Sequence, residues 1–337
     1  MTIDPGRRRG MPPFHMDLTA IYAPIRDDLD ELQNLLEREL ITPDPFIGEL
    51  VRHVLSTPGK MIRPALVCLS AKVSGGAAEA RLWIAGAVEL IHVASLIHDD
   101  IIDAADTRRG TPTVNVQWGN QIAVLLGDYL FAKAFDLLSR VRNPEVSLAM
   151  AAASVQMSQG MIMEVKYGSQ AHDDEGMYFQ IISGKTAHLF SAACRAGGLA
   201  AGNRWAADAL GTFGQEWGMA FQITDDALDL TSQAEQLGKP IHSDIRGGKT
   251  TLPLIHALRT AGPADRNRLL DLLAGPLRDG QMNEVRGLLS RYQGIEYALE
   301  VAGGYSRRAA ESLTPLGGGP AKDSLLKLTE FVVVRSR

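Results

Sequence analysis

Two short acidic segments carry the side chains best suited to chemistry. They read Asp99-Asp100-Ile101-Ile102-Asp103 and Asp225-Asp226-Ala227-Leu228-Asp229, and apolar, helix-like sequence surrounds both. Residues four apart on a helix lie about 40° apart around the axis, so the first and last aspartates of each segment share one face. Crowded carboxylates repel each other unless a cation lies between them. The two segments therefore predict two walls of one metal site, and walls made of carboxylates alone suit Mg²⁺.

The middle aspartate of each segment has a different expected role. Asp100 and Asp226 lie about 100° around the helix from the aspartate before them. We therefore expect them to support the metal ligands rather than to bind the metal.

Basic and polar side chains surround both segments in the sequence. Diphosphate is a polyanion, and lysine and arginine are the side chains that hold phosphate oxygens. No serine–histidine or cysteine–histidine arrangement accompanies them, so we expect catalysis by charge stabilisation and positioning. The side chains are Lys60, Arg63, Arg108, Arg109, Lys185, Lys239 and Lys249, with His92 two turns before Asp99 and Gln222 one turn before the second segment.

The composition favours a helical protein. The chain has 337 residues, of which 45% are hydrophobic and only 6% aromatic, a balance typical of helices rather than of β-sandwiches. Its net charge of −5 argues against binding to nucleic acid. Cys68 and Cys194 are isolated in apolar runs, which fits a reducing compartment and predicts a cytoplasmic protein. No uncharged apolar run reaches the length of about 18 residues that spans a bilayer, so we expect no transmembrane segment.

Helical periodicity runs through nearly the whole chain. Residues 1–15 contain three arginines and no apolar run, which predicts a flexible tail. The absence of a linker predicts a single all-α domain over residues 16–337. The predicted helices are 17–40, 45–56, 63–75, 77–104, 120–140, 144–167, 173–183, 185–201 and 203–230, with loops at 107–113 and 231–248 and about four shorter helices after them.

The chain resembles the trans-polyprenyl diphosphate synthases of the medium- and long-chain, octaprenyl type, from about residue 17 to its end. The resemblance is specific because seven motifs occur in the family's order. They are GKMIRP (59–64), HVASLIHDDIID (92–103), RRGTPT (108–113), GKTAHLF (184–190), FQITDDALD (221–229), GKPIHSD (238–244) and GGKTTLPLI (247–255).

The resemblance implies both a fold and a reaction. The fold is an all-α bundle of the isoprenoid-synthase type around a deep central cavity. The reaction joins isopentenyl diphosphate head-to-tail (1'-4) to an allylic diphosphate such as a farnesyl, geranylgeranyl or shorter primer. The product is an all-trans polyprenyl diphosphate, and the cofactor is Mg²⁺, about three ions per site bound with diphosphate.

The resemblance also implies residue roles. Metal ligands are Asp99, Asp103, Asp225 and Asp229. The isopentenyl diphosphate site contains Lys60, Arg63, His92 and Arg109. The allylic diphosphate site contains Arg108, Lys185, Thr186, Gln222, Lys239 and Lys249, and the residues closest to the chemistry are Asp99, Asp103, Lys185, Asp225 and Lys239.

Small residues before the first acidic segment bear on product length. Helical geometry directs the growing prenyl chain along Val88, Ile91, Ala94 and Ser95, where short-chain family members commonly carry bulky aromatics. The alternative is ordinary packing of small residues between helices. An open path predicts a product longer than farnesyl and beyond geranylgeranyl, with Met157 and Met161 lining it more deeply.

Three residues depart from the family pattern. His242 stands where the family often has glycine, and Met161 and Glu164 stand where Glu and Gln are common. The last two changes are expected to alter the deep lining of the tunnel. Similar synthases form homodimers through helices near 120–138, and the apolar face of that segment allows the same here.

Two other interpretations compete with a self-sufficient synthase. His98 beside Asp99 allows an H-D metal phosphohydrolase, although the remaining histidines lack the spacing such a site needs. A non-catalytic or partner-dependent subunit of a heteromeric prenyl synthase is the other, although such subunits usually lose parts of the acidic motifs and none is lost here.

Overall fold

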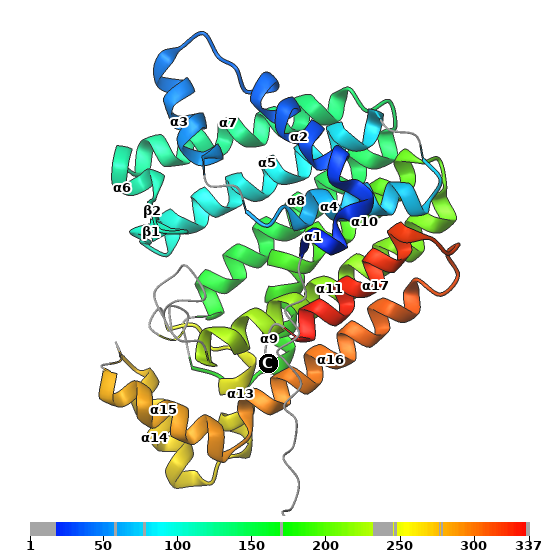
Figure 1. Cartoon of the computed structure of the whole chain (residues 1–337). Helices are drawn as coiled ribbons and strands as arrows, with labels where there is room; N and C mark the ends of the chain where they lie inside the picture. The colour runs from blue at the N-terminus through cyan, green and yellow to red at the C-terminus, as the bar shows by residue number, and fades with distance from the viewer. Residues whose placement is uncertain are drawn as a thin grey trace, which may run out of the picture.

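The computed structural model describes residues 18–56, 59–76, 79–168, 171–231, 245, 248–275, 277 and 279–334. Over these residues the chain is built of helices with one short hairpin, which confirms the predicted all-α class (Figure 1). The elements are α1 (Leu18–Ile21), the 3₁₀ turn η1 (Ala23–Ile25), α2 (Arg26–Glu39), α3 (Pro45–Leu55), α4 (Ile62–Val73), α5 (Glu79–Ile102), β1 (Thr107–Arg108), β2 (Thr111–Pro112), α6 (Val114–Trp118), α7 (Asn120–Ser139), α8 (Pro144–Met163), the π-helical turn η2 (Glu164–Gly168), α9 (Glu175–Ile182), the π-helical turn η3 (Ser183–Ala187), α10 (His188–Ala200), α11 (Arg204–Thr231), α13 (Leu252–Thr260), α14 (Pro263–Leu273), α15 (Asp279–Arg291), α16 (Gly294–Ser312) and α17 (Pro320–Val334).

Side-chain caps and prolines fix where several helices begin. The Asp44 carboxylate accepts hydrogen bonds from two N–H groups in the first turn of α3, and Pro45 takes the first helical position. Asn143 and Pro144 repeat this arrangement at the start of α8. Proline costs no helical hydrogen bond there because the first N–H groups of a helix have no partner in any case.

The helices that carry the two acidic segments lie in one packed body. α5 packs against α4, α7 and α10, and α11 packs against α10 and α16. Val88, Ile91 and Ala94 on α5 are completely buried. Because α5 and α11 share α10 as a neighbour, the ends of both helices reach the same part of the molecule.

A second apolar cluster lies toward the C-terminal side. It joins α13, α14 and α15 through buried side chains that include Leu258, Leu269 and Val285. α14 and α15 lie at the lower left of Figure 1, and α13 packs against the long helix α16. The single domain predicted over 16–337 stays a prediction.

Two predicted boundaries were wrong for local reasons. The helix predicted over 17–40 is divided into α1, η1 and α2, because Pro24 lacks an N–H group and starts a new turn. The loop predicted at 107–113 forms a hairpin in which Arg108 pairs with Thr111. Gly110 closes its turn with a φ of +78°. The tail at 1–15 and most of the loop at 231–248 lie outside the described residues.

Two described helices are long and apolar enough to cross a membrane by length and composition alone. They are Glu79–Ile102, with a mean hydropathy of 1.5 and 72% of the apolar window buried, and Pro144–Gly168, with 1.2 and 28%. A core helix passes this test as readily as a membrane span does. The expected absence of a transmembrane segment therefore stays a prediction.

Candidate active site

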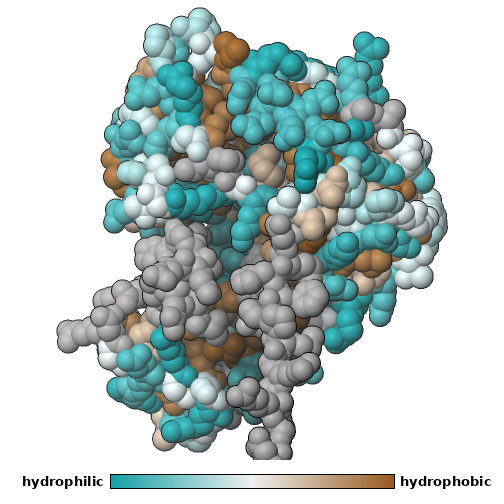
Figure 2. Space-filling view, viewed as in Figure 1, coloured by the Kyte–Doolittle hydropathy of each residue, from teal (hydrophilic) through white to brown (hydrophobic). Residues whose placement is uncertain are grey.

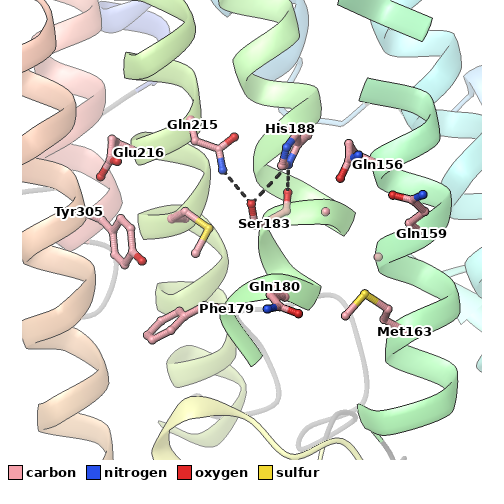
Figure 3. Close-up of a pocket in the computed structure, with 13 residues that line it drawn as sticks. Gln156, Gln159, Met163, Phe179, Gln180, Ser183, His188, Gln215, Glu216 and Tyr305 are labelled. Carbon is pink, nitrogen blue, oxygen red and sulfur yellow. Dashed lines mark hydrogen bonds between the residues drawn. The ribbon is translucent and has the colours of Figure 1, made fainter. Parts of the chain in front are cut away.

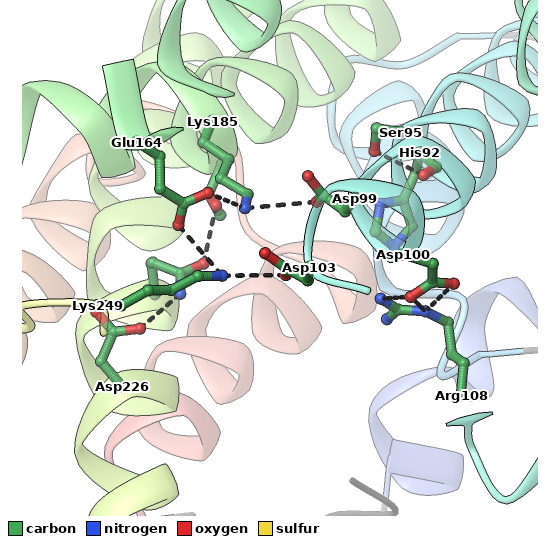
Figure 4. A network of polar contacts seen from close by, with 12 residues as sticks. His92, Ser95, Asp99, Asp100, Asp103, Arg108, Glu164, Lys185, Asp226 and Lys249 are labelled. Carbon is green, nitrogen blue, oxygen red and sulfur yellow. Dashed lines mark hydrogen bonds and ion pairs between the residues drawn. The ribbon is translucent and has the colours of Figure 1, made fainter. Parts of the chain in front are cut away.

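Five charged side chains alternate in sign where α5, η2, η3 and the segment before α13 meet (Figure 4). Lys249 Nζ lies 3.1 Å from the Asp103 carboxylate and 3.6 Å from that of Glu164. Glu164 also pairs with Lys185, whose Nζ lies 3.5 Å from the Asp99 carboxylate. The structure thus brings the outer aspartates of the first segment together with two of the predicted diphosphate lysines.

The charges in this series support one another. Burial raises the pKa of Asp99, and the Lys185 ammonium offsets part of that effect. Burial alone would lower the pKa of Lys185, but the Asp99 and Glu164 carboxylates outweigh it and hold that pKa above its usual value. Lys185 is therefore a cation at neutral pH that can exchange its carboxylate partners for a polyanion.

Close packing at two glycines holds η3 between α8 and α11. A methyl group at Gly160 of α8 would overlap the backbone nitrogen of Lys185. A methyl group at Gly218 of α11 would lie 2.7 Å from Cα of Ala187. Backbone atoms packed this closely leave no space for movement, so this packing fixes the positions of Lys185 and Thr186.

The second acidic segment lies on the last turns of α11. Asp226 and Asp229 are buried, with 6% and 7% of their surfaces exposed, and Asp225 is half-buried. Burial lowers the pKa of Arg63 to about 10, while the Glu89 and Asp225 carboxylates act in the opposite direction. Asp225 is therefore near the start of α4, so the second wall faces the predicted isopentenyl diphosphate residues.

A chain of hydrogen bonds links α9, η3 and α11. Thr186 Oγ1 donates to Gln222 Oε1 over 2.8 Å. Gln222 Nε2 donates to Asp226 Oδ1 over 2.7 Å, and the Tyr178 hydroxyl donates to Asp226 Oδ2 over 2.6 Å. Both oxygens of this middle aspartate thus accept hydrogen bonds from the protein.

Arg63 and His92 form the centre of the predicted isopentenyl diphosphate site. Arg63 Nη1 lies 3.0 Å from His92 Nε2, and the guanidinium lies over the Phe190 ring at 4.2 Å from its centre. Because a guanidinium can only donate, His92 Nε2 accepts and the neutral imidazole carries its proton on Nδ1. Burial and the nearby arginines hold the pKa of His92 well below its usual value. His92 therefore orients Arg63 as a neutral acceptor.

Lys60 and Arg109 lie beside this pair. The Tyr22 hydroxyl donates to the Lys60 carbonyl over 2.9 Å. A methyl group at Gly59 would lie 3.0 Å from Cζ of Arg109, so that guanidinium packs directly on the glycine. The charge of Arg109 also lowers the pKa of His92, so the structure brings Arg63, His92 and Arg109 together.

Glu89 is a charged residue that the sequence analysis missed. Its carboxylate is 8% exposed; burial raises its pKa, and the guanidinium groups of Arg63 and Arg109 lower it. It supplies negative charge beneath two arginines. A single glutamate within the apolar run 82–97 was the sequence feature that could have identified it.

Left-handed backbone conformations occur beside the charged residues. Of the four non-glycine residues with positive φ in the described part of the chain, three are Met61 (50°), Ala104 (48°) and Arg109 (53°). Each costs about 1 kcal/mol or more for a residue with a Cβ atom. Met61 lies next to Lys60, Ala104 lies next to Asp103, and Arg109 is itself a predicted ligand. The folded structure therefore accepts backbone strain at positions that orient the charged side chains.

Arg108 pairs with Asp100 and not with the carboxylates that bind the predicted allylic lysines. Its Nε lies 2.9 Å from each carboxylate oxygen of Asp100, and its Nη2 lies 2.6 Å from Oδ1. The hairpin turns Arg108 back onto α5, so that the middle aspartate of the first segment holds the arginine (Figure 4).

Three other predicted residues have different outcomes. Lys239 and His242, in the motif at 238–244, lie outside the described residues. Glu164 was expected to alter the tunnel lining, and the structure instead pairs it with Lys185 and Lys249. The π-helical turn that begins at this residue changes the direction of the side chain.

The residues predicted to set product length lie inside the core. Val88, Ile91 and Ala94 are fully buried, and Ser95 is 6% exposed. The Ser95 hydroxyl donates to the His92 carbonyl over 2.7 Å. These small side chains lie directly below the isopentenyl diphosphate pair.

A cavity of about 570 Å³ lies between α8, η3, α11 and α16 and has none of these residues in its lining (Figure 3). Its walls carry mostly polar groups: Gln156, Gln159, Ser183, His188, Gln215 and Tyr305 are among them. The acidic segments and Lys185 are absent from the lining, but Gly160 and Gly184, which pack against each other beside Lys185, belong to it.

The donors around the charged site fit magnesium. Asp99 and Asp103 on α5 and Asp225 and Asp229 on α11 offer only oxygen atoms. Within the part of the chain that the structure describes, no three His, Cys, Asp or Glu side chains lie together as a metal site. Paired carboxylates leave coordination positions for water and phosphate oxygens, as Mg²⁺ prefers, whereas zinc favours a closed set of His and Cys ligands.

His98 does not support the phosphohydrolase interpretation. Its Nε2 lies 3.3 Å from the Val124 carbonyl and 3.7 Å from the Asp128 carboxylate, and its ring stacks on Phe131. These contacts direct His98 to α7 and not to the acidic wall.

Comparison with known proteins identifies the family. The polyprenyl synthetase family model matches residues 44–289. The chain is 37% identical to heptaprenyl diphosphate synthase component 2 of Geobacillus stearothermophilus, over 94% of this chain and 98% of that protein. It is 36% identical to nonaprenyl diphosphate synthase of Mycobacterium tuberculosis (93% and 94% covered) and 39% identical to a short chain isoprenyl diphosphate synthase of Methanothermobacter thermautotrophicus (88% and 92%).

Solved structures agree with this result. A polyprenyl synthase of Caulobacter crescentus, complexed with calcium and isoprenyl diphosphate, matches with a TM-score of 0.90 and 30% identity, over 95% of this chain and 98% of that one. A decaprenyl diphosphate synthase of Rhodobacter capsulatus matches with a TM-score of 0.89 and 32% identity, over 94% and 98%. The chain therefore belongs to the polyprenyl synthetase family and is a trans-prenyltransferase with the all-α fold of the isoprenoid synthases.

Proposed function

We propose that this enzyme joins isopentenyl diphosphate to an allylic diphosphate in a Mg²⁺-dependent 1'-4 condensation. The observation that carries the proposal is the alternating series Asp103, Lys249, Glu164, Lys185 and Asp99. It gathers cations for a diphosphate and carboxylates for a metal in one place. The Arg63–His92 pair nearby supplies a second anion site.

The lysines would bind the allylic diphosphate by exchanging partners. Lys185 and Lys249 would leave the carboxylates and bind phosphate oxygens, and Thr186 with its hydrogen-bond partner Gln222 would then face the carbon that becomes cationic. Mg²⁺, when bound at the outer aspartates of both segments, neutralises the charge of the departing diphosphate. Charge stabilisation of this kind needs no side-chain nucleophile.

The second substrate would bind at the start of α4. Arg63, held by His92 and Phe190, takes the isopentenyl diphosphate together with Lys60 and Arg109. The double bond then attacks the allylic cation, and the proton lost from the isopentenyl unit passes to an oxygen of the released diphosphate. Burial and the nearby arginines hold the pKa of His92 well below its usual value, so His92 is a weak base and does not compete for that proton.

We propose a product longer than geranylgeranyl diphosphate. The small buried residues Ala94 and Ser95 support a path for a long chain, and relatives of comparable similarity are named heptaprenyl and nonaprenyl synthases. Because another relative is named a short chain synthase, the mass of the product is the measurement that decides length.

We also propose a homodimer formed through α7 and α8. Large apolar side chains on these helices are exposed: Leu125 at 63%, Leu148 at 71% and Ile162 at 67%. The face seen in Figure 2 is mostly polar or neutral with scattered apolar side chains. A second copy would cover the apolar faces of α7 and α8, which explains the low burial of α8. The cytoplasmic location stays a prediction.

The direct test uses the purified chain alone. It is incubated with Mg²⁺, isopentenyl diphosphate and farnesyl diphosphate, and the products are measured by mass. Chain elongation with release of diphosphate is the expected result. Hydrolysis without elongation would contradict the proposal. Activity only with an added second protein would favour the partner-dependent interpretation, to which the name "component 2" of the Geobacillus relative gives weight.

A further inference from the structure

We propose that Tyr178 is a positioning residue for the reaction: acting through Asp226, it keeps the amide oxygen of Gln222 facing the site beside Thr186. This inference rests on the proposed condensation, because it concerns the group that faces the allylic cation. Neither acidic segment contains Tyr178, and it lies on α9, some 48 residues before the aspartate that it contacts.

The contacts define a direction along the chain of hydrogen bonds. A carboxylate can only accept, so the Gln222 amide must present Nε2 to Asp226 Oδ1, at 2.7 Å. Its Oε1 therefore faces the opposite way and accepts from Thr186 Oγ1 at 2.8 Å. An amide that turned by half a rotation would present two N–H groups in place of that oxygen.

The orientation matters because the two ends of an amide have opposite partial charges. The carbonyl oxygen is negative and stabilises a neighbouring allylic cation, while the NH₂ end repels it. Fixed dipoles aimed at developing charge are among the largest contributions to catalysis. Gln222 thus needs an anchor that accepts from Nε2 and does not itself rotate.

Tyr178 supplies that anchor for Asp226. Its hydroxyl occupies Oδ2 at 2.6 Å while Gln222 occupies Oδ1. The Tyr178 side chain is 4% exposed and belongs to an apolar cluster with Ile223 and Ala227 of α11. Packing fixes the Tyr178 ring, the Tyr178 hydroxyl fixes the Asp226 carboxylate, and that carboxylate fixes the Gln222 amide.

A matched pair of variants tests this role. Tyr178→Phe removes the hydroxyl and keeps the ring. Tyr292→Phe removes the same kind of bond far from the site, since the Tyr292 hydroxyl donates to Asp265 Oδ2 at 2.7 Å. Both variants should melt within about 5 °C of the parent. Only Tyr178→Phe should lower kcat, by about tenfold, with the KM for isopentenyl diphosphate within twofold of the parent.

A double-mutant cycle separates positioning from general damage. Gln222→Met keeps the length of the side chain and removes the amide. If Tyr178 acts through Gln222, adding Tyr178→Phe to Gln222→Met should leave kcat within twofold of the single Gln222 variant. The proposal is overturned if Tyr178→Phe slows both backgrounds equally, or if it leaves kcat of the parent unchanged. A parent enzyme that makes no elongated product would instead refute the proposed condensation.

Discussion

Gly160 offers a sharp test of how the active-site lysine is held. The substitution Gly160→Ala adds one methyl group on α8 against the backbone of η3. That group would overlap the Lys185 nitrogen and would lie 2.8 Å from the Gly184 carbonyl carbon and 3.0 Å from Cα of Lys185. All three are backbone atoms, so no side-chain rotation can relieve the overlap.

The size of the effect follows from these distances. Ordinary contact begins near 3.4 Å, so the η3 backbone must move by about 1 Å at the Lys185 nitrogen, a shift that the long lysine side chain can partly take up before it reaches Nζ. Overpacking of a core costs about 1–3 kcal/mol, and replacing glycine by alanine within a helix returns about 0.5–1 kcal/mol. We therefore expect a loss of about 1–2 kcal/mol in unfolding free energy. A displacement of 1 Å at a reacting group can cost about 100-fold in rate, so about tenfold is expected here in kcat/KM for the allylic substrate.

The assay compares both substrates in the variant and in a control. Gly287→Ala in α15 is a suitable control because a methyl group there meets nothing within 4 Å; it should gain about 0.5–1 kcal/mol in stability and keep parental kinetics. In Gly160→Ala the KM for isopentenyl diphosphate should stay within twofold of the parent, since the Arg63 pair lies apart from η3. A folded Gly160→Ala enzyme with parental allylic kinetics would show that this packing does not position Lys185.

Three further predictions concern the other parts of the site. Burial and Arg63 hold the pKa of His92 well below 6.5. The unfolded chain therefore takes up a proton below about pH 6.5 that the native protein does not, so the free energy of unfolding falls as the pH drops. Urea unfolding between pH 5.5 and 7.5 should show a smaller fall in that free energy for His92→Gln than for the parent. Ala94→Phe should shorten the product because the ring fills the path below the first acidic segment, and an unchanged product mass would show that Ala94 does not line that path. Chelation with EDTA should abolish elongation, because the diphosphate then meets uncompensated carboxylates, and excess Mg²⁺ should restore it; elongation that persists in EDTA would argue against the metal role.

The local parts of this molecule could be predicted from the sequence. The spacing within each acidic segment places Asp99 with Asp103 on one helical face, and this needs only the regular geometry of an α-helix. Proline and cap residues marked the starts of α3 and α8 in the same way. Such features depend on neighbours within about one helical turn, so a single sequence contains them.

Irregular backbone defeated the same reasoning. Comparison with the family pattern predicts that Glu164 alters the deep tunnel lining, but the π-helical turn at 164–168 accommodates an extra residue and shifts the helical phase. The resemblance implies an allylic diphosphate role for Arg108, which stays a prediction; the contact of Arg108 with Asp100, set by the hairpin with Arg109 at a φ of 53°, was not predicted. Neither a π-helical turn nor an arginine with a left-handed backbone conformation can be recognised from the residue types.

The outer and the middle aspartates of the acidic segments have different kinds of partner. The outer aspartates of the first segment pair with Lys185 and Lys249, which are partners that can exchange a carboxylate for phosphate. The middle aspartates bind donors that stay in the protein: Asp100 holds Arg108, and Asp226 holds Tyr178 and Gln222. Each oxygen of Asp226 accepts one of these hydrogen bonds and keeps a second lone pair, but the two bonds fix the orientation of the carboxylate, and the loss of one costs about 1.5–3 kcal/mol. In the first segment, therefore, two aspartates pair with lysines of the site and one fixes a neighbouring element, and the doubled aspartate places the two functions about 100° apart around the helix axis.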